Sequence, residues 1–376
     1  MLAGFATPEG TARYRDRFAQ LRDAGHFRRP ENVPGAGQLW LSSIGLGTYL
    51  GEPDDTADAA YTDAMVAALR SGMNVLDTAI NYRHQRSERN LGAAIKLLVE
   101  AGQLQRDEVF VCTKAGYLSF DGNMPVDPRG YFMHEYVEAG ILDPRQLAGG
   151  MHCMAPGYLE NQIGRSRRNL GLETIDLFYV HNPESQLGDV ARDVFRDRLK
   201  DAFAMLERSV REGKLRRYGV ATWGAFRVAE SARDYISLFE LADIARQAGG
   251  EHHHFRFVQL PFSLAMPEAY GLLNQTDGRE KMSLLTAASR LGIAVMGSAT
   301  LQQGHLTHGL PVFIARVLGM KTDAENSIQF SRSAPGMTTS LIGMGHKEHV
   351  AANLKPAFFP LTKREEWLKL FIEHEE

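Results

Sequence analysis

Met73-Asn74-Val75-Leu76-Asp77 is an apolar run that ends on an acid, and two later runs of the chain end in a similar way. Val109-Phe110-Val111-Cys112-Thr113 ends on Lys114, and Ile175-Asp176-Leu177-Phe178-Tyr179-Val180 ends on His181. A charge at the carboxyl end of a buried parallel strand is costly unless it faces a pocket, and α/β barrels place their active sites at these ends. With Tyr82 five residues after Asp77, the three endings predict one catalytic site.

Strand and helix patterns alternate from Gly45 onward. A GxGxxG dinucleotide fingerprint is missing, because Gly45-Leu46-Gly47-Thr48 lacks the third glycine and an acid about 20 residues later. Eight strand–helix pairs favour a closed (β/α)8 TIM barrel of the α/β class over an open sheet. We expect strands near residues 44–48, 73–77, 109–114, 175–181, 216–221, 256–260, 293–297 and 338–343, and helices near 57–71, 87–101, 157–170, 196–212, 229–247, 279–290, 321–333 and 346–353.

Two segments depart from this alternation. We expect residues 1–36 to form an N-terminal extension that contains a polar helix. The Pro- and Gly-rich stretch 26–46 predicts a hairpin that plugs the barrel floor. Residues 37–376 then form a single barrel domain whose tail, from residue 363, is a final helix. The stretch 117–156 exceeds the usual connection of about 2–6 residues and is rich in aromatic side chains. We expect a lid-like insertion on the catalytic face; the alternative is a surface excursion without a role.

The bulk composition excludes several classes of protein. A net charge of −3 over 376 residues gives no sign of nucleic-acid binding, and no apolar stretch is long enough for a membrane span. We expect a cytoplasmic enzyme, because a signal-peptide pattern is missing and one of the two cysteines lies in a buried strand. We expect no metal site: His252-His253-His254 are consecutive, and a zinc-type spacing is absent.

Four residue types fit proton transfer to a carbonyl oxygen. Tyr82 would be the donor, although a free phenol has a pKa near about 10. An ammonium at Lys114 would stabilise the phenolate and lower that pKa, with Asp77 holding the lysine in place. His181 would orient the substrate oxygen. Side chains offer no hydride, so the set implies a nicotinamide cofactor.

A series of short segments over residues 40–355 forms a known pattern. These are Gly45-Leu46-Gly47-Thr48, Asn74-Val75-Leu76-Asp77-Thr78-Ala79 through Tyr82, Ser87-Glu88-Arg89-Asn90-Leu91-Gly92, Thr113-Lys114, Ser166 to Leu170, Ile175-Asp176-Leu177 with His181, and Thr339 to Leu354. In these segments the chain resembles the aldo-keto reductase family. The resemblance implies a TIM-type barrel, NADP used without a Rossmann fold (NAD being the alternative), and Asp77, Tyr82, Lys114 and His181 as catalytic residues.

The second half departs from the family pattern at the cofactor. Ala221-Thr222 stands where the family has Ser-Asn, Ser298 where an aromatic residue stacks on nicotinamide, and Ala352 where a glutamate precedes Asn353. Gln259 matches the carboxamide-binding glutamine. The residues implied to bind cofactor are Gly47, Thr48, Tyr49, Asp77, Asn182, Thr222, Gln259, Ser298, Leu301, Gly304, Gly343, Met344, Gly345, His349 and Asn353.

Two functions follow. The first is an NAD(P)H-dependent oxidoreductase that interconverts an aldehyde, ketone or sugar-like carbonyl and its alcohol, with Tyr82 as general acid or base. Its substrate would touch Tyr49, Tyr117, Phe120 and Trp223. The alternative is a nicotinamide-nucleotide sensor or regulatory subunit of the same fold with little turnover, favoured by Ala221 and Ser298. The identity of the carbonyl and the oligomeric state are not encoded in these motifs.

Overall fold

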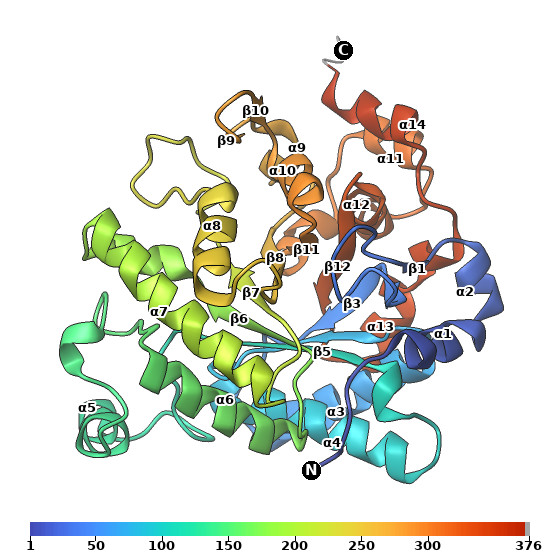
Figure 1. The fold of residues 1–376 in the computed structure, drawn as a ribbon. Coiled ribbons are helices and arrows are strands. Elements are labelled where there is room, and N and C mark those ends of the chain that lie inside the picture. The colour runs from blue at the N-terminus through green and yellow to red at the C-terminus, as the bar shows by residue number, and fades with distance from the viewer. Residues whose placement is uncertain (373–376) are drawn as a thin grey trace.

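Eight parallel strands close into a barrel in the computed structural model, which describes residues 1–372 (Figure 1). Strand β12 pairs with β3, with Ser340 opposite Ile44 and Gly343 opposite Gly47, so the sheet has no open edge. The predicted (β/α)8 barrel is confirmed. Its strands are β3 (Ile44–Gly47), β4 (Val75–Asp77), β5 (Phe110–Ala115), β6 (Leu177–His181), β7 (Tyr218–Ala221), β8 (Phe255–Pro261), β11 (Ala294–Ser298) and β12 (Met337–Gly343).

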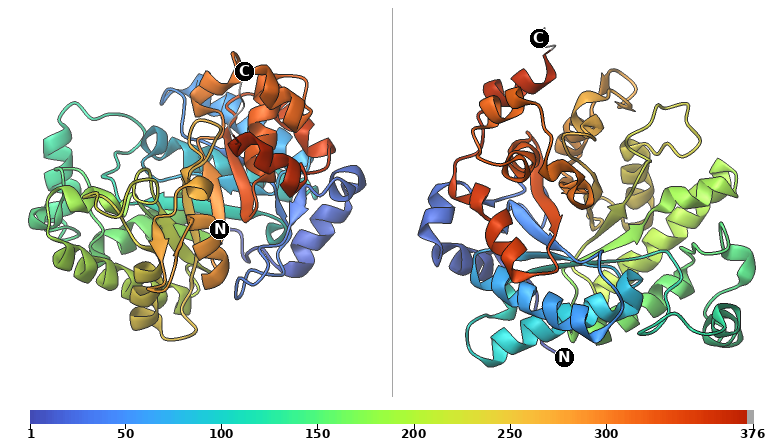
Figure 2. Two further views of the ribbon diagram at one scale, coloured as in Figure 1. Left: turned by 90° about the horizontal axis from the view of Figure 1, so that it is seen from above. Right: turned by 180° about the vertical axis from the view of Figure 1, so that it is seen from behind.

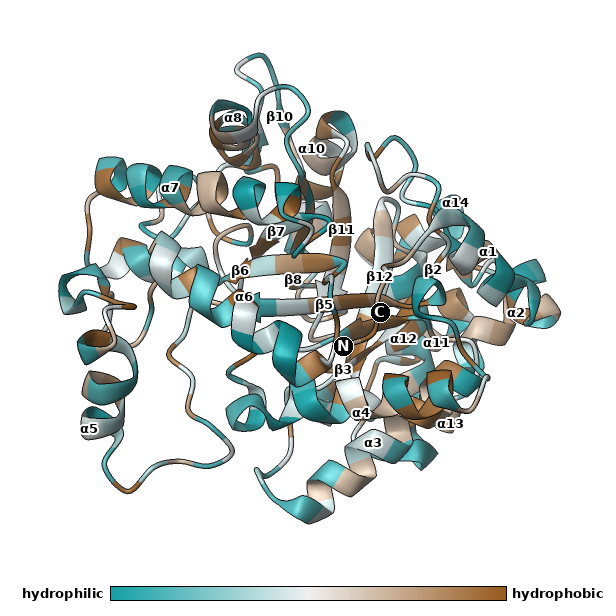
Figure 3. Cartoon of the chain, turned by 60° about the horizontal axis from the view of Figure 1, so that its bottom comes forward, coloured by the Kyte–Doolittle hydropathy of each residue, from teal (hydrophilic) through white to brown (hydrophobic). Residues whose placement is uncertain are grey.

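Helices surround the barrel and turn their hydrophilic sides outward (Figure 3). They are α3 (Asp55–Arg70), α4 (Arg86–Glu100), α6 (Pro156–Leu170), α7 (Arg192–Arg211), α8 (Leu238–Gly249), α10 (Leu284–Leu291), α12 (Asp323–Ser333) and α13 (Lys347–Asn353). The side chains of Asp54, Ser237, Ser283 and Thr322 each accept a backbone N–H at a helix start. Such caps stabilise a helix by about 1 kcal/mol each and fix where it begins.

Two predicted helices begin later than expected. The helix expected over 229–247 starts at Leu238, because carbonyls of the preceding segment are taken by a side chain from elsewhere. Arg192 donates to the carbonyl of Tyr235 at 2.8 Å and to that of Ala232 at 3.4 Å. The helix expected over 279–290 starts at Leu284. Before it, β9 (Gln275–Thr276) and β10 (Lys281–Met282) form a small antiparallel hairpin.

The N-terminal segment through residue 42 packs against the amino end of the barrel. After α1 (Pro8–Asp16) and α2 (Ala19–Asp23), strand β1 (Phe27–Arg28) pairs with β2 (Leu41–Ser42). Leu39 and Leu41 are buried in one cluster with the interior residues Val75 and Phe110, so the hairpin closes the amino end of the barrel. The extension also lies beside the C-terminal strand (Figure 2), where Arg28 donates to the carbonyl of Met337 at 2.6 Å.

The insertion after β5 carries α5 (Pro128–Phe132), a π-helix (Met133–Glu138) and a 3₁₀ turn (Pro144–Gln146). Figures 1 and 2 show α5 standing apart from the ring of barrel helices. Short helices elsewhere are α9 (Glu268–Gly271), α11 (Val312–Leu318) and α14 (Arg364–Leu368), and 3₁₀ segments cover Tyr82–Gln85, Arg106–Glu108, Pro183–Gly188, Gln302–Thr307, Lys355–Phe358 and Lys369–Phe371. The predicted final helix thus ends by Phe371, and its last four positions lie outside the described residues.

Two further observations bear on function. No helix within residues 1–372 combines the length and the apolar character needed to cross a bilayer. Over the same residues, no group of three His, Cys, Asp or Glu side chains is placed to hold a metal ion. Cys112 and Cys153 are both buried free thiols.

Candidate active site

The four predicted catalytic residues meet at the carboxyl end of the barrel. Asp77 ends β4, Lys114 lies near the end of β5, and His181 ends β6, while Tyr82 follows in the loop after β4. The Lys114 ammonium donates to Asp77 Oδ2 at 2.5 Å and to the carbonyl of Thr78 at 2.8 Å. It also lies 3.5 Å from the phenol oxygen of Tyr82, the long limit of a hydrogen bond.

The protonation states of this group follow from burial and pairing. Burial by itself lowers the pKa of Lys114, but the Asp77 carboxylate and the Tyr82 phenol outweigh it, so the pKa lies above its usual value. Burial raises the pKa of Tyr82, and the nearby ammonium opposes this only in part. Lys114 does act to lower the pKa of Tyr82, as expected. The net pKa of the phenol is nevertheless raised, whereas a lowered value was expected.

The imidazole of His181 is neutral. Burial lowers its pKa well below the usual value, and the charge of Lys114 adds to the effect. Its ring lies edge-on to Tyr82 and Tyr117, with ring centroids 5.9 and 5.3 Å apart. Nδ1 is buried without a partner among the described residues. Because Tyr82 and His181 both line the same cleft, a ligand oxygen there could contact both.

His152, which the sequence patterns did not single out, fixes the backbone of His181. Burial lowers the pKa of His152 to about 4, so this ring is also neutral. Its Nε2 donates to the carbonyl of His181 at 2.7 Å, while Nδ1 accepts from Gln186 at 2.8 Å. A Cβ at Gly116 would lie 2.5 Å from the His181 carbonyl oxygen, so this close approach requires glycine.

Glu184 is a second residue that the sequence patterns missed. Its Oε1 accepts the backbone N–H groups of Trp223 at 2.6 Å and of Gly224 at 3.1 Å. Burial raises the pKa of this carboxyl, and those amides oppose the shift. The side chain therefore holds the loop after β7, from which a half-exposed Trp223 faces the cleft.

A cleft of about 1410 Å³ opens at this end of the barrel. It exceeds the roughly 300–1,000 Å³ typical of a site for one drug-sized ligand, which leaves room for a dinucleotide and a second small molecule. Lys114 is fully buried and does not line the cleft. The predicted residues that line it are Gly47, Thr48, Tyr49, Asp77, Tyr82, Tyr117, Phe120, His181, Asn182, Thr222, Trp223, Gln259, Ser298, Leu301, Gly304, Gly343, Gly345, His349 and Asn353.

Two residues predicted to bind the cofactor, Met344 and Gln259, have surroundings other than those expected. The Met344 side chain is fully buried in the hydrophobic core and does not line the cleft. Gln259 lines the cleft, but its amide donates to Asp77 Oδ1 at 2.9 Å. With Lys114 on the other oxygen, both oxygens of the Asp77 carboxylate are engaged.

The far end of the cleft suits an extended ligand. Its wall between β11 and α12 contains Ala299, Gln302 and Gln303, all in left-handed conformations that cost energy and are typical of functional loops. The Cβ position of Gly343 is open to a distance of 4 Å, so a ligand can approach the backbone there. Within residues 1–372, no lysine or arginine side chain lines the cleft, and histidines such as His349 supply its basic groups.

Comparison with known proteins gives a consistent result. A model of the aldo/keto reductase family matches residues 43–310. The chain is 26% identical to the NADH-specific methylglyoxal reductase of Escherichia coli over 212 residues, which are 55% of each protein. It is 28% identical to the D-threo-aldose 1-dehydrogenase of a Pseudomonas species over 210 residues, 54% of this chain and 57% of that protein. The chain thus spans about half the length of these curated relatives.

Solved structures share the architecture over most of the chain. An aldo/keto reductase from Klebsiella pneumoniae, in complex with NADP and acetate, matches with a TM-score of 0.59 and 21% identity, covering 89% of this chain and 91% of that one. The glycerol dehydrogenase of Gluconobacter oxydans matches with a TM-score of 0.63 and 18% identity, covering 93% and 94%. At these identities the similarity shows the fold alone.

Proposed function

Since the chain belongs to the aldo/keto reductase family, we propose that it is an NAD(P)H-dependent oxidoreductase that interconverts a carbonyl compound and its alcohol. The observation that carries the proposal is the contact chain from Asp77 through Lys114 to Tyr82 at the base of the cleft. A buried ammonium beside a phenol can stabilise the phenolate that forms during proton transfer.

Tyr82 gives its proton to the carbonyl oxygen when the carbonyl is reduced. The Lys114 ammonium then stabilises the phenolate that remains, and Asp77 keeps that ammonium charged and in place. The neutral His181 hydrogen-bonds the same oxygen and orients it toward the phenol. In the reverse direction the Tyr82 phenolate takes the proton of the alcohol.

The nicotinamide cofactor supplies the hydride, which no side chain can provide. Asn182, Thr222 and Gln259 are suited to hold its reactive end, because they line the cleft beside Asp77. Ser298, Leu301, Gly304, Gly343, Gly345, His349 and Asn353 would hold the rest. NADP is in the Klebsiella structure and the Escherichia coli relative is NADH-specific, so both cofactors are candidates for this chain.

The substrate is an aldehyde, ketone or sugar-like carbonyl. Tyr49, Tyr117, Phe120 and Trp223 line the cleft and offer apolar faces to such a molecule. Tyr117 and Phe120 come from the start of the insertion and Met151 from its later part, whereas residues 121–150 do not line the cleft. We therefore assign only the two ends of segment 117–156 to the substrate wall.

A nucleotide sensor with little turnover is the second candidate. It is favoured by the engagement of Gln259 with Asp77 and by Ser298, which carries no ring to stack on nicotinamide. The experiment that separates the two titrates the purified protein with NADPH and NADH and then follows cofactor absorbance over a panel of aldehydes, ketones and sugars. Turnover of any panel member supports the enzyme. Tight cofactor binding without turnover supports the sensor, and no binding contradicts both.

A further inference from the structure

The turn that follows Tyr82 has an uncommon backbone. Arg83, His84 and Gln85 have φ angles of 48°, 53° and 72°, so three consecutive residues other than glycine are left-handed. Residues with side chains rarely adopt this conformation, and it persists only where the surroundings hold it. The contacts of Arg83 identify what holds the turn.

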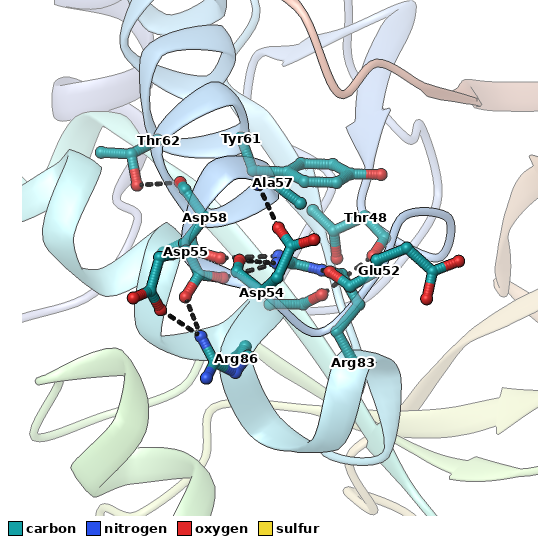
Figure 4. Close-up of polar contacts among 12 residues, drawn as sticks. Thr48, Glu52, Asp54, Asp55, Ala57, Asp58, Tyr61, Thr62, Arg83 and Arg86 are labelled. Carbon is teal, nitrogen blue, oxygen red and sulfur yellow. Dashed lines mark hydrogen bonds and ion pairs between the residues drawn. The ribbon is translucent and has the colours of Figure 1, made fainter. Parts of the chain in front are cut away.

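The guanidinium of Arg83 reaches a neighbouring loop, and Figure 4 shows its surroundings. Nε donates to the carbonyl of Glu52 at 2.8 Å, and Nη2 donates to that of Asp54 at 3.3 Å. Nη2 also pairs with Asp58 at 2.5 Å, and Nη1 donates to Asn90 at 2.8 Å. Its side chain is 1% exposed, so this arginine is a buried structural residue and not a solvated surface charge.

The loop it holds, residues 48–54, is here named the rim loop. It connects β3 to α3, and much of it lines the cleft. Tyr49 in the rim loop packs edge-on against Tyr82, with ring centroids 5.1 Å apart. Tyr61 lies 5.1 Å from the Arg83 guanidinium and donates to the carbonyl of Leu50 at 2.6 Å. The rim loop therefore contacts the Tyr82 turn near its start, through Tyr49, and near its end, through the carbonyls of Glu52 and Asp54.

We propose that Arg83 is a positioning residue that fastens the rim loop to the Tyr82 turn and so sets the wall of the cleft against which the substrate and Tyr82 are aligned. The effect on catalysis rests on the function proposed above, but the fastening itself does not. Two loop carbonyls depend on one guanidinium fork, whose geometry a lysine cannot reproduce. Loss of the fork frees Tyr49 to move away from Tyr82.

Arg86 provides a matched control. It pairs with the same Asp58 at 2.6 Å and with Asp55 at 3.0 Å, but its Nε donates to the carbonyl of Gly122 and not to the rim loop. Because Arg86 stays paired with Asp58 when Arg83 is replaced, Arg83→Gln leaves no unpaired acid at this position. The two variants thus remove one arginine each from the same carboxylate, and only one of them releases the rim loop.

The first test is limited proteolysis with chymotrypsin, read by mass spectrometry for cleavage after Tyr49 and Leu50, which are 60% and 41% exposed. Cleavage of a native loop reports its local opening. We expect Arg83→Gln to raise the cleavage rate at these two bonds about tenfold or more, and Arg86→Gln to leave it near the wild-type rate. Equal rates in Arg83→Gln and the wild type, or equal acceleration by both variants, would overturn the proposal.

The second test separates positioning from stability by comparing Arg83→Gln with Arg83→Gly. Glycine accepts the left-handed conformation without strain, so the glycine variant should have the higher Tm. We expect both variants to lose about tenfold in kcat/KM for the carbonyl despite that difference. If the variant with the higher Tm also has the higher kcat/KM, the role of Arg83 is structural only, and the proposed positioning role is wrong. If the wild type turns over no carbonyl, the proposed function fails, while the proteolysis still decides whether Arg83 fastens the loop.

Discussion

The ammonium of Lys114 lies 3.5 Å from the phenol oxygen of Tyr82. Burial raises the pKa of that phenol, and the ammonium is the main group that lowers it. At neutral pH the phenol is therefore protonated and ready to donate, and the charge that stabilises its conjugate base is already in place. In the proposed mechanism, both the donation of the proton and its recovery use this contact.

Replacement of Lys114 by Met should shift the pH dependence of alcohol oxidation. Oxidation needs the Tyr82 phenolate, and loss of the ammonium raises the pKa of the phenol further. The acidic limb of kcat should move to higher pH. Since Lys114→Met leaves Asp77 buried without its partner, the double variant Asp77→Asn/Lys114→Met serves as a control for stability. An unchanged limb in a folded variant would remove Lys114 from the relay.

His181 should contribute no titration near neutral pH. The pKa of His181 lies well below the usual value of about 6.5. The ring is therefore neutral near neutral pH and becomes protonated only in more acidic solution. At saturating cofactor, kcat for carbonyl reduction should show no inflection near pH 6.5. The expectation is wrong if the wild type has an inflection there that His181→Gln abolishes.

The charge of the substrate should matter, because no lysine or arginine within residues 1–372 lines the cleft. A carboxylate placed there lacks a cationic partner, and burial of an unpaired charge is unfavourable. We expect kcat/KM for 4-carboxybenzaldehyde to be about tenfold below that for benzaldehyde. Trp223→Arg should narrow the gap, since residue 223 faces the cleft. If the wild type prefers 4-carboxybenzaldehyde to benzaldehyde, the cleft does offer a carboxylate a cationic partner, and the prediction is wrong.

A stability prediction concerns the floor of the barrel. The fully buried Asp176 pairs with Arg106 at 2.6 Å and accepts the backbone N–H of Ala6 at 2.6 Å, which anchors the N-terminal extension. Arg106→Met should lower the free energy of unfolding by about 3–5 kcal/mol, because it leaves a buried carboxylate unpaired. Urea unfolding measures this. The double variant Asp176→Asn/Arg106→Met should recover part of the loss, and a single variant as stable as the wild type would rule the pair out as an anchor.

The barrel could be predicted from the sequence because its signals are local. Several strands are apolar runs, and Asp77, Lys114 and His181, at or near the ends of β4, β5 and β6, are residue types that a parallel strand rarely buries away from a pocket. The segment 229–237 was wrongly predicted as helical for the opposite reason. Carbonyls of Ala232 and Tyr235 in this segment accept hydrogen bonds from Arg192, which lies 40 and 43 positions away in the chain.

The sequence predicts which residues gather at the candidate site better than it predicts their contacts. Gln259 and Asp77 are 182 positions apart, and no pattern in either segment indicates that the amide bonds the carboxylate. The sequence patterns do not single out Arg83, which is buried against Glu52 and Asp58. Contacts of this kind depend on the geometry of the closed barrel, which brings distant loops to one end.

The central claim is that Tyr82 is the proton donor, and Tyr82→Phe tests it most directly. Cofactor affinity, measured by fluorescence titration, and carbonyl reduction, measured by cofactor absorbance, should be compared in the same preparation of wild type and variant. The account predicts cofactor affinity close to that of the wild type and a kcat lower by about 10²–10⁴-fold, the usual contribution of general acid catalysis. Turnover at the wild-type rate in the folded variant would contradict it.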